Sequence, residues 1–131
     1  MADMLHFSLV SPERELFAGD VKQVDAPGAE GEFGVLPNHA PFMTTLRPGL
    51  VRIHEGEKTT ALFVRGGFAD VTPAGLTILA EEAIDPAGVD VAALEKEISD
   101  LREDAKDTGD AARRAHAEGR LAYLEALRAV V

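Results

Sequence analysis

There is no cysteine among the 131 residues of this protein. This absence excludes a disulfide framework, a thiolate metal site and a cysteine nucleophile, and it fits a reducing compartment. No segment approaches the run of about 20 apolar residues that spans a bilayer, and residues 1–10 lack a basic leader. We therefore expect a soluble chain that does not insert directly into the bilayer.

Basic residues are scarce, with 13 lysines and arginines against 23 acidic residues and a formal net charge of −10. Such a charge is repelled by nucleic-acid phosphates and by anionic lipid headgroups, so the composition argues against nucleic acid as a partner. The charge does not argue against a protein as a partner. The hydrophobic content of 46% is sufficient for a packed core in a protein of this length.

The sequence also lacks the motifs of common catalytic and metal sites. None of its four lysines follows a glycine-rich loop, so a P-loop is absent. The histidines match no metal-ligand spacing and the serines lie outside any nucleophile elbow. Glu30, Glu32 and His39 form an acid/base set only if a pocket brings them together. We therefore expect this protein to hold no catalytic residue, no metal and no cofactor.

Short apolar runs separated by turn residues characterise residues 1–88, which hold all seven prolines and ten of the twelve glycines. In the first run, residues 5–10, Leu5, Phe7 and Leu9 alternate with more polar residues, which predicts a half-buried strand. Further strands are predicted at 21–26, 42–46, 50–54, 59–64, 68–71 and 76–80. About eight short strands without intervening helices predict an antiparallel β-sandwich or flattened barrel over residues 1–85.

Two glycine-rich stretches interrupt this pattern. Residues 65–68, RGGF, lie between two predicted strands with no following helix, so we interpret them as a strand kink or bulge. Residues 28–41, GAEGEFGVLPNHAP, contain three glycines and two prolines. So much backbone restraint predicts a shaped loop from which Glu30, Glu32, Asn38 and His39 project. A tight connection between two strands is the alternative interpretation.

After Asp85 the apolar period changes from 2 to about 3.5, which predicts helices. We expect Asp90 to cap a first helix, Thr108 and Gly109 to end it, and Asp110 to cap a second helix. The expected apolar faces are Val91, Leu94, Ile98, Leu101 and Ala105 on the first helix, and Ala117, Leu121, Leu124, Leu127 and Val131 on the second. The short connection predicts an antiparallel two-helix hairpin over residues 86–131, and the fold class is therefore α+β.

The charges of the two predicted helices are opposite in sign. Residues 90–107 carry seven acids and three bases, and residues 110–131 carry three acids and four arginines. The helices should therefore attract each other weakly. Gly119 costs about 1 kcal/mol relative to alanine, so we expect the hairpin to be marginally stable.

Four segments and the order of the elements together resemble the epsilon subunits of the F-type ATP synthase. The segments are VSPE at 10–13, FAG at 17–19, GEFGVLPNHAP at 31–41 and GGFADV at 66–71. The resemblance begins at Leu5 and extends over nearly the whole sequence. It implies a β-sandwich followed by a helical hairpin, and a non-catalytic rotor component rather than an enzyme.

The resemblance also implies partners and site residues. One face of the sandwich would bind the central-stalk gamma subunit, and its lower loops would contact the c-ring and transmit torque during ATP synthesis driven by proton transport. Glu32, His39, Pro41 and Phe42 match the ring-contacting loops of the family, and Glu30 offers a further hydrogen-bonding group there. The implied location is peripheral, on the cytoplasmic side of the bacterial inner membrane.

In many members of this family the hairpin is also a switch. It permits rotation when folded on the sandwich and obstructs ATP hydrolysis when it extends into the alpha/beta hexamer. Some members bind ATP through a motif of Ile or Leu, Asp, two variable residues, Arg and Ala. Here Ile84 and Asp85 keep the first two positions but Gly88 replaces the arginine, so we predict weak or no ATP binding. A stand-alone nucleotide-sensing module is the alternative function.

Overall fold

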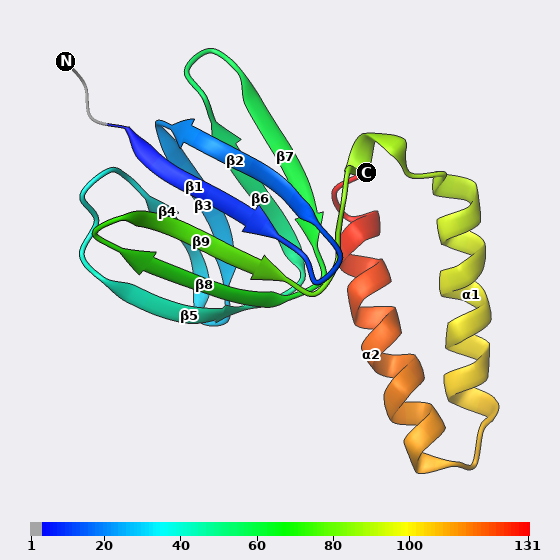
Figure 1. The fold of residues 1–131 in the computed structure, drawn as a ribbon. Helices are drawn as coiled ribbons and strands as arrows, with labels where there is room; N and C mark the ends of the chain where they lie inside the picture. Colours follow the sequence, from blue (N-terminus) through cyan, green and yellow to red (C-terminus); the bar gives the residue numbers. More distant parts are fainter. Residues whose placement is uncertain (1–3) are drawn as a thin grey trace. The chain divides into compact units, whose positions relative to one another are not determined.

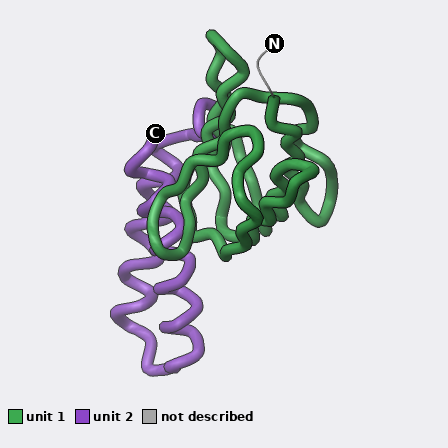
Figure 2. The backbone as a smooth tube through the Cα atoms, turned by 90° about the vertical axis from the view of Figure 1, so that its left-hand side faces the viewer, with its two compact units in different colours: residues 1–85 green, residues 86–131 purple. Residues whose placement is uncertain are grey.

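The computed structural model describes residues 4–131, which belong to two compact units (Figure 2). The first unit ends at Asp85 and is built from strands, and the second begins at Pro86 and is built from helices. A β-sandwich followed by two C-terminal helices confirms the expected fold class.

The strands of the first unit form a sheet of ten that folds over on itself into a sandwich (Figure 1). Its order is β10-β7-β6-β3-β5-β8-β9-β1-β2, with β4 paired to β3 outside this path. The strands are β1 (Leu5–Val10), β2 (Glu15–Val21), β3 (Gln23–Gly28), β4 (Gly31–Val35), β5 (Phe42–Leu46), β6 (Gly49–His54), β7 (Thr59–Val64), β8 (Gly67–Thr72), β9 (Gly75–Ala80) and β10 (Ala83–Ile84). Strands β1 and β9 run parallel, whereas the other described pairs are antiparallel.

Alternating side chains of these strands form the sandwich core. Leu5, Phe7 and Leu9 of β1 are buried, at 4%, 0% and 0% exposure, as their alternation predicts. They belong to one apolar cluster with side chains from facing strands, including Val24 of β3 and Ile53 of β6. Each large apolar side chain buried in this way contributes about 1.5–3 kcal/mol, so the cluster is the main stabilising element of the first unit.

Three strands, β2, β4 and β10, are not predicted by the sequence patterns. Strand β4 pairs with β3 and places Gly31 opposite Gly28, so the first half of residues 28–41 is a tight hairpin. The prediction of a shaped loop over residues 28–41 is therefore correct only for residues 36–41. The predicted strand 21–26 is also wrong at its start, because β2 ends at Val21 and the backbone bends at Lys22 before β3. Glycines within β2 and β4 interrupt the apolar alternation, so neither strand can be recognised from the sequence pattern.

The glycine pair in residues 65–68 has a structural role. Gly66 and Gly67 have φ values of 147° and 131°, which side-chain-bearing residues rarely adopt. A Cβ atom on Gly67 would overlap the backbone carbonyl oxygen of Leu79 in the neighbouring strand β9. Gly67 therefore permits the close approach of β8 and β9.

The second unit contains a short 3-10 helix (Pro86–Gly88), α1 (Val91–Asp107) and α2 (Ala111–Arg128), and the two α-helices are antiparallel (Figure 1). The expected caps are confirmed. The Asp90 carboxylate accepts a hydrogen bond from the Ala93 amide at 3.1 Å, and that of Asp110 accepts one from the Ala112 amide at 2.9 Å. Thr108 is the C-cap of α1.

The apolar faces of the helices are confirmed in part. The structure buries Leu94 and Ile98 of α1 together with Ala117, Leu124 and Leu127 of α2. It also buries Tyr123, at 3% exposure, which lies outside the predicted face. The remaining predicted members are half-buried, namely Val91, Leu101, Ala105, Leu121 and Val131.

Candidate functional site

The predicted ring-contact residues lie in β4, in β5 and in the connections beside them. Glu30 lies in the turn after β3, Glu32 in β4, His39 and Pro41 in the loop 36–41, and Phe42 at the start of β5. Four of them are exposed and His39 is half-buried. All five residues are therefore available, at least in part, to a partner.

The loop 36–41 has a defined conformation. Asn38 has a φ of 65°, a left-handed value that asparagine tolerates better than most residues. The His39 amide donates to the Leu36 carbonyl at 3.2 Å and closes the turn. The imidazole Nδ1 of His39 lies 2.7 Å from the carbonyl oxygen of Ala40, so the ring is held against the loop backbone.

Aromatic rings connect this loop to the strands on either side. The rings of Phe33 in β4 and Phe42 in β5 pack edge to face, with centroids 5.4 Å apart and planes at 69°. The His39 ring packs against the same Phe42 ring at 6.4 Å and 61°. Such pairs contribute about 0.5–1.5 kcal/mol each beyond their buried area. Phe33 therefore positions Phe42, a role that sequence reasoning missed.

A groove of about 350 Å³ brings some of the predicted residues together. It is lined by Gly28, Glu30, Gly31, Glu32, Phe33, Phe42, Met43 and Thr44. Glu30, Glu32 and Phe42 thus share one surface, whereas His39 reaches it only through its contact with Phe42. Met43 is 60% exposed beside them and was not predicted as a contact residue.

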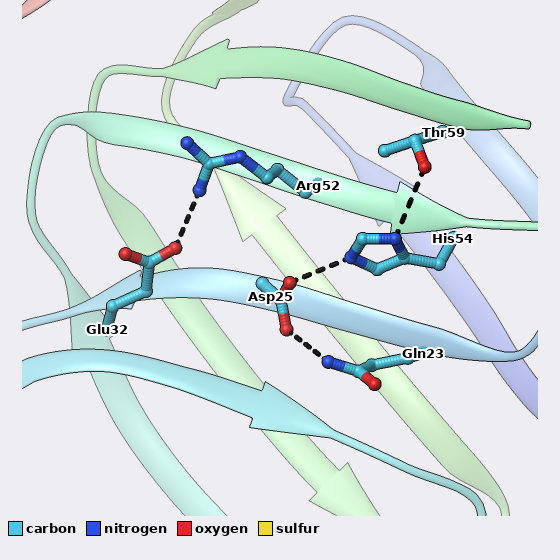
Figure 3. A network of polar contacts seen from close by, with 6 residues as sticks. All are labelled: Gln23, Asp25, Glu32, Arg52, His54 and Thr59. Carbon is cyan, nitrogen blue, oxygen red and sulfur yellow. Dashed lines mark hydrogen bonds and ion pairs between the residues drawn. The ribbon is translucent and has the colours of Figure 1, made fainter.

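Glu32 is held by an arginine from a strand that does not pair with β4. Arg52 in β6 donates from Nη1 to Oε1 of Glu32 at 2.7 Å, across the intervening strand β3 (Figure 3). Both side chains are about half exposed. The ion pair fixes the direction of the Glu32 carboxylate, and sequence reasoning could not find it because the partners are 20 residues apart.

A second polar network lies next to this pair on β3 and β6 (Figure 3). His54 contacts Asp25 through Nε2 and Oδ2 at 2.8 Å, and Gln23 donates to the other carboxylate oxygen at 2.6 Å. Burial raises the pKa of the Asp25 carboxyl, but the two hydrogen bonds and the coulombic attraction of His54 and Arg52 outweigh it and lower that pKa below its ordinary value. The network therefore favours the charged form of Asp25 and ties β3 to β6.

The outer surface of β5, β8, β9 and β1 carries a row of uncharged side chains. The strand register places Thr45 opposite Phe68, Phe68 opposite Leu79, and Leu79 opposite Val10. Leu79 is 53% exposed, and Phe68 and Val10 are half-buried. These four residues, here called the apolar face, extend across four strands without a charge.

The residues at the positions of the ATP-binding motif lie in three different local structures. Ile84 is half-buried in β10, Asp85 is exposed after it, and Gly88 is exposed at the end of the 3-10 helix. A Cβ atom at Gly88 would meet no atom within 4 Å. The structure therefore offers no steric reason for the glycine that replaces the motif arginine.

The arginines of α2 are engaged within the helical unit. Arg113 lies 3.9 Å from Asp104, and Arg120 lies 3.5 Å from Glu97. Arg114 donates to the Thr108 carbonyl at 2.8 Å. These guanidinium groups therefore already have a hydrogen-bond acceptor or an acidic partner in the helical unit.

Residues 4–131 contain neither a candidate metal cluster nor a helix suited to cross a membrane. No group of three histidine, cysteine, aspartate or glutamate side chains in this range is arranged to hold a metal ion. No helix in the same range is long and apolar enough to cross a membrane.

Both units match known protein families. Residues 4–86 match the family model described as ATP synthase, Delta/Epsilon chain, beta-sandwich domain, and residues 90–131 match that of the C-terminal domain of the ATP synthase epsilon chain. The ATP synthase epsilon chain of Maricaulis maris is 56% identical over 130 residues, which cover 99% of this protein and 98% of the relative. The match therefore includes nearly all of both proteins.

A solved structure and a shorter relative extend the comparison. A subunit in the cryo-EM structure of Euglena gracilis mitochondrial ATP synthase, OSCP/F1/c-ring in rotational state 1, has a TM-score of 0.87 and 28% identity, covering 97% of this protein and 81% of that subunit. The ATP synthase epsilon chain of Caulobacter vibrioides is 66% identical over 83 residues, which are 63% of this protein and 96% of the relative. That relative is too short to contain both units. From the two family models and the relatives together, the protein belongs to the family of ATP synthase epsilon chains.

Proposed function

We propose that this epsilon chain is a non-catalytic rotor subunit that links the gamma subunit to the c-ring and transmits torque in the proton-translocating F-type ATP synthase. The observation that carries the proposal is the presence of two different contact surfaces on one sandwich. The first is the apolar face, and the second is the stiffened loop 36–41 with the groove beside it. One rigid body with two such surfaces is suited to couple two partners.

The apolar face is proposed as the surface that binds gamma. Stable protein interfaces have an apolar core depleted of charged residues. Across Thr45, Phe68, Leu79 and Val10 there is no charge, although the net charge of the protein is −10. This row therefore has the composition of an interface core.

The loop surface is proposed as the contact with the polar loops of the c-ring. Glu30, Glu32 and His39 offer hydrogen bonds, and Pro41 and Phe42 add apolar area. The Arg52 pair and the aromatic contacts fix two of these groups before a partner arrives. Because a pre-ordered surface loses less entropy on binding, the contact can be stiff and specific.

Strand β5 connects the two proposed surfaces. Phe42 at its start lines the groove, and Thr45 three residues later belongs to the apolar face. The strand pairs with β8 over its whole length, from Phe42 opposite Val71 to Leu46 opposite Gly67. A force applied at the loop would therefore pass directly into the hydrogen-bonded sheet that carries the apolar face.

The helical unit is proposed as a regulatory element, which in its extended state contacts the alpha/beta hexamer. The short Caulobacter vibrioides relative supports a role separate from assembly, because a protein of that length lacks room for both units. In this proposal the protein works as a peripheral subunit on the cytoplasmic side of the bacterial inner membrane.

Recovery of the complex from native membranes tests the proposal. The tagged protein should recover gamma together with other ATP synthase subunits. Leu79→Asp should reduce recovery of gamma at least about tenfold, since a charge in an interface core costs several kcal/mol. Ser99→Asp, which adds the same charge on an exposed position of α1, should recover gamma like the parent. Recovery of no ATP synthase subunit by the parent would refute the proposal, and normal recovery by Leu79→Asp would refute the assignment of the face.

A further inference from the structure

The arginines of the helical unit form a set of contacts that the proposed function does not use. Residues 90–131 contain five arginines, and four of them form ion pairs between α1 and α2. The pairs are Arg128–Glu95 at 2.8 Å, Arg102–Glu125 at 3.1 Å, Arg120–Glu97 at 3.5 Å and Arg113–Asp104 at 3.9 Å. The fifth arginine, Arg114, donates from α2 to the carbonyls of Ala105 and Thr108 at the end of α1.

These pairs are distributed along the hairpin rather than gathered at one point. Glu95 lies in the second turn of α1 and pairs with the last residue of α2, whereas Asp104 lies near the end of α1 and pairs with the third residue of α2. Both directions occur, because Arg102 of α1 binds Glu125 of α2. Separation of the helices would therefore break contacts from one end of the hairpin to the other.

Few apolar side chains are buried near the connecting turn, where Ala117 is the only buried residue of 101–117. There, Leu101, Ala112 and Ala117 line a hollow of about 430 Å³ together with the Asp104–Arg113 pair and His116. The small or half-buried side chains at this end contribute less dispersion energy to the helix–helix contact than large buried side chains would. The ion pairs therefore carry a larger share of the helix–helix attraction than they would beside a fully packed seam.

We propose that these ion pairs form an electrostatic clasp that makes the separation of α1 from α2 depend on ionic strength. The side chains in the four pairs are 32–67% exposed, so solvent ions reach them. Exposed pairs each change an equilibrium by about 1.5- to 5-fold, and several acting together multiply. The Debye length falls from about 10 Å at 0.1 M salt to about 3 Å at 1 M, which is comparable to the gaps that the pairs span.

In this proposal the separation of α1 from α2 responds to the salt concentration and not to a nucleotide. The three arginines of α2 nearest the connecting turn in sequence already have partners in the helical unit. Arg114 and Arg120 donate hydrogen bonds, and Arg113 forms an ion pair. A phosphate group would have to displace those partners before it could bind there. The consequence for ATP hydrolysis rests on the proposed regulatory function, whereas the clasp itself is a property of the helical unit.

A distance measurement in the full-length protein tests the clasp. The protein has no cysteine, so Ser99→Cys in α1 and Ala122→Cys in α2 place two spin labels on exposed positions. The population with separated helices should rise at least about fivefold between about 20 mM and 1 M potassium chloride. A distance distribution that is identical at both salt concentrations would overturn the proposal.

Charge variants give a second, independent readout in the same labelled protein. Arg128→Glu should raise the separated population at low salt about fivefold or more, and the double change Glu95→Arg with Arg128→Glu should restore it to within about twofold of the parent. Lys96→Glu is the matched control, because Lys96 pairs with Asp100 inside α1 and makes the same change in charge. Equal distances in the parent and in Arg128→Glu would overturn the clasp, as would equal effects of Arg128→Glu and Lys96→Glu.

Two further measurements, circular dichroism of the variants and ATP hydrolysis by the assembled enzyme, distinguish the possible outcomes. If circular dichroism shows that Arg128→Glu loses helix, recovery of both helix and the short distance in the double variant still supports the clasp. In the assembled enzyme, a salt-dependent distance without any effect of the hairpin on ATP hydrolysis would support the clasp and refute the regulatory function. The two proposals can therefore fail independently.

Discussion

Arg52 holds Glu32 from across the strand that separates them, with Nη1 of the guanidinium 2.7 Å from the carboxylate oxygen Oε1. An exposed ion pair of this kind adds at most about 1 kcal/mol to stability. Its larger effect is on direction, because a carboxylate that is already oriented needs no ordering when a partner binds. The pair therefore links the polar surface of the sheet to the proposed ring contact.

Removal of the side chains of Glu32 and His39 should loosen the coupling between proton flow and ATP synthesis. The double change to alanine removes two oriented hydrogen-bonding groups, and we expect proton-driven ATP synthesis in membrane vesicles to fall about twofold or more. Glu57→Ala in the turn between β6 and β7 is the control and should synthesise ATP like the parent. Unchanged synthesis in the double variant would show that these side chains are dispensable.

Asp25 should make the stability of the sandwich sensitive to acid. Its pKa is lower in the folded protein than in the unfolded protein, so folding favours the ionised form. This contribution is fully present above the unfolded pKa of about 3.9 and is lost as the pH falls through the folded value. Asp25→Asn should lower the free energy of unfolding by about 1–2 kcal/mol at pH 7 and reduce its decline toward pH 3.

Urea denaturation at several pH values measures this effect. The exposed pair His6–Asp20, at 3.1 Å, supplies the matched control because it combines the same two residue types on the surface. Asp20→Asn should change stability by less than about 0.5 kcal/mol. Equal losses in the two variants would contradict the role assigned to the half-buried network.

The Gly67 position should tolerate no side chain. Gly67→Ala would force a methyl group against the carbonyl of Leu79 at a φ of 131°, and we expect a loss of more than about 2 kcal/mol in the free energy of unfolding. Gly66→Ala shares the positive φ, but the nearest atom to its methyl group would be 3.5 Å away. A comparable loss in both variants would mean that backbone strain, and not the approach of β9, sets the requirement.

The sequence predicted those elements whose local signal agrees with their place in the fold. The Leu5, Phe7 and Leu9 alternation predicted β1 with its bounds, and Asp90 and Asp110 predicted the starts of both helices. Strand β4 was missed because Gly31 and Gly34 are typical of loops, and only pairing with β3 makes the segment extended. Here tertiary pairing overrides local preference.

The site could be predicted less fully than the fold. The resemblance supplied Glu32, His39 and Phe42, but the groups that orient them, Arg52 and Phe33, follow from strand order alone. The apolar face also follows from strand order, because Val10 and Leu79 are far apart in sequence and become neighbours through the parallel pairing of β1 with β9. Long-range register is not encoded in any short pattern.

The parent protein should bind ATP weakly or not at all. Calorimetry at millimolar ATP should show no saturable heat, because Gly88 supplies no guanidinium for the phosphates. Gly88→Arg is sterically free and should increase binding about tenfold or more if the motif arginine is the missing group. Saturable binding by the parent that disappears in Asp85→Ala would favour the nucleotide-sensing alternative.

The sandwich should fold and assemble without the helical unit. A truncated protein ending at Gly88 keeps the whole apolar cluster of the first unit, so it should unfold cooperatively and still recover gamma. The measurement is the recovery of gamma by the tagged truncated protein relative to the full-length protein. Loss of recovery by a truncated protein that remains folded would mean that the helices carry part of the attachment.

Cryo-electron microscopy of the intact ATP synthase tests the central claim most directly. We predict that this subunit turns with the rotor, with Val10, Phe68 and Leu79 against gamma and the loop 36–41 against the c-ring in every rotational state. A subunit that keeps one position relative to the outer stator while gamma rotates would contradict the proposed role as a rotor subunit.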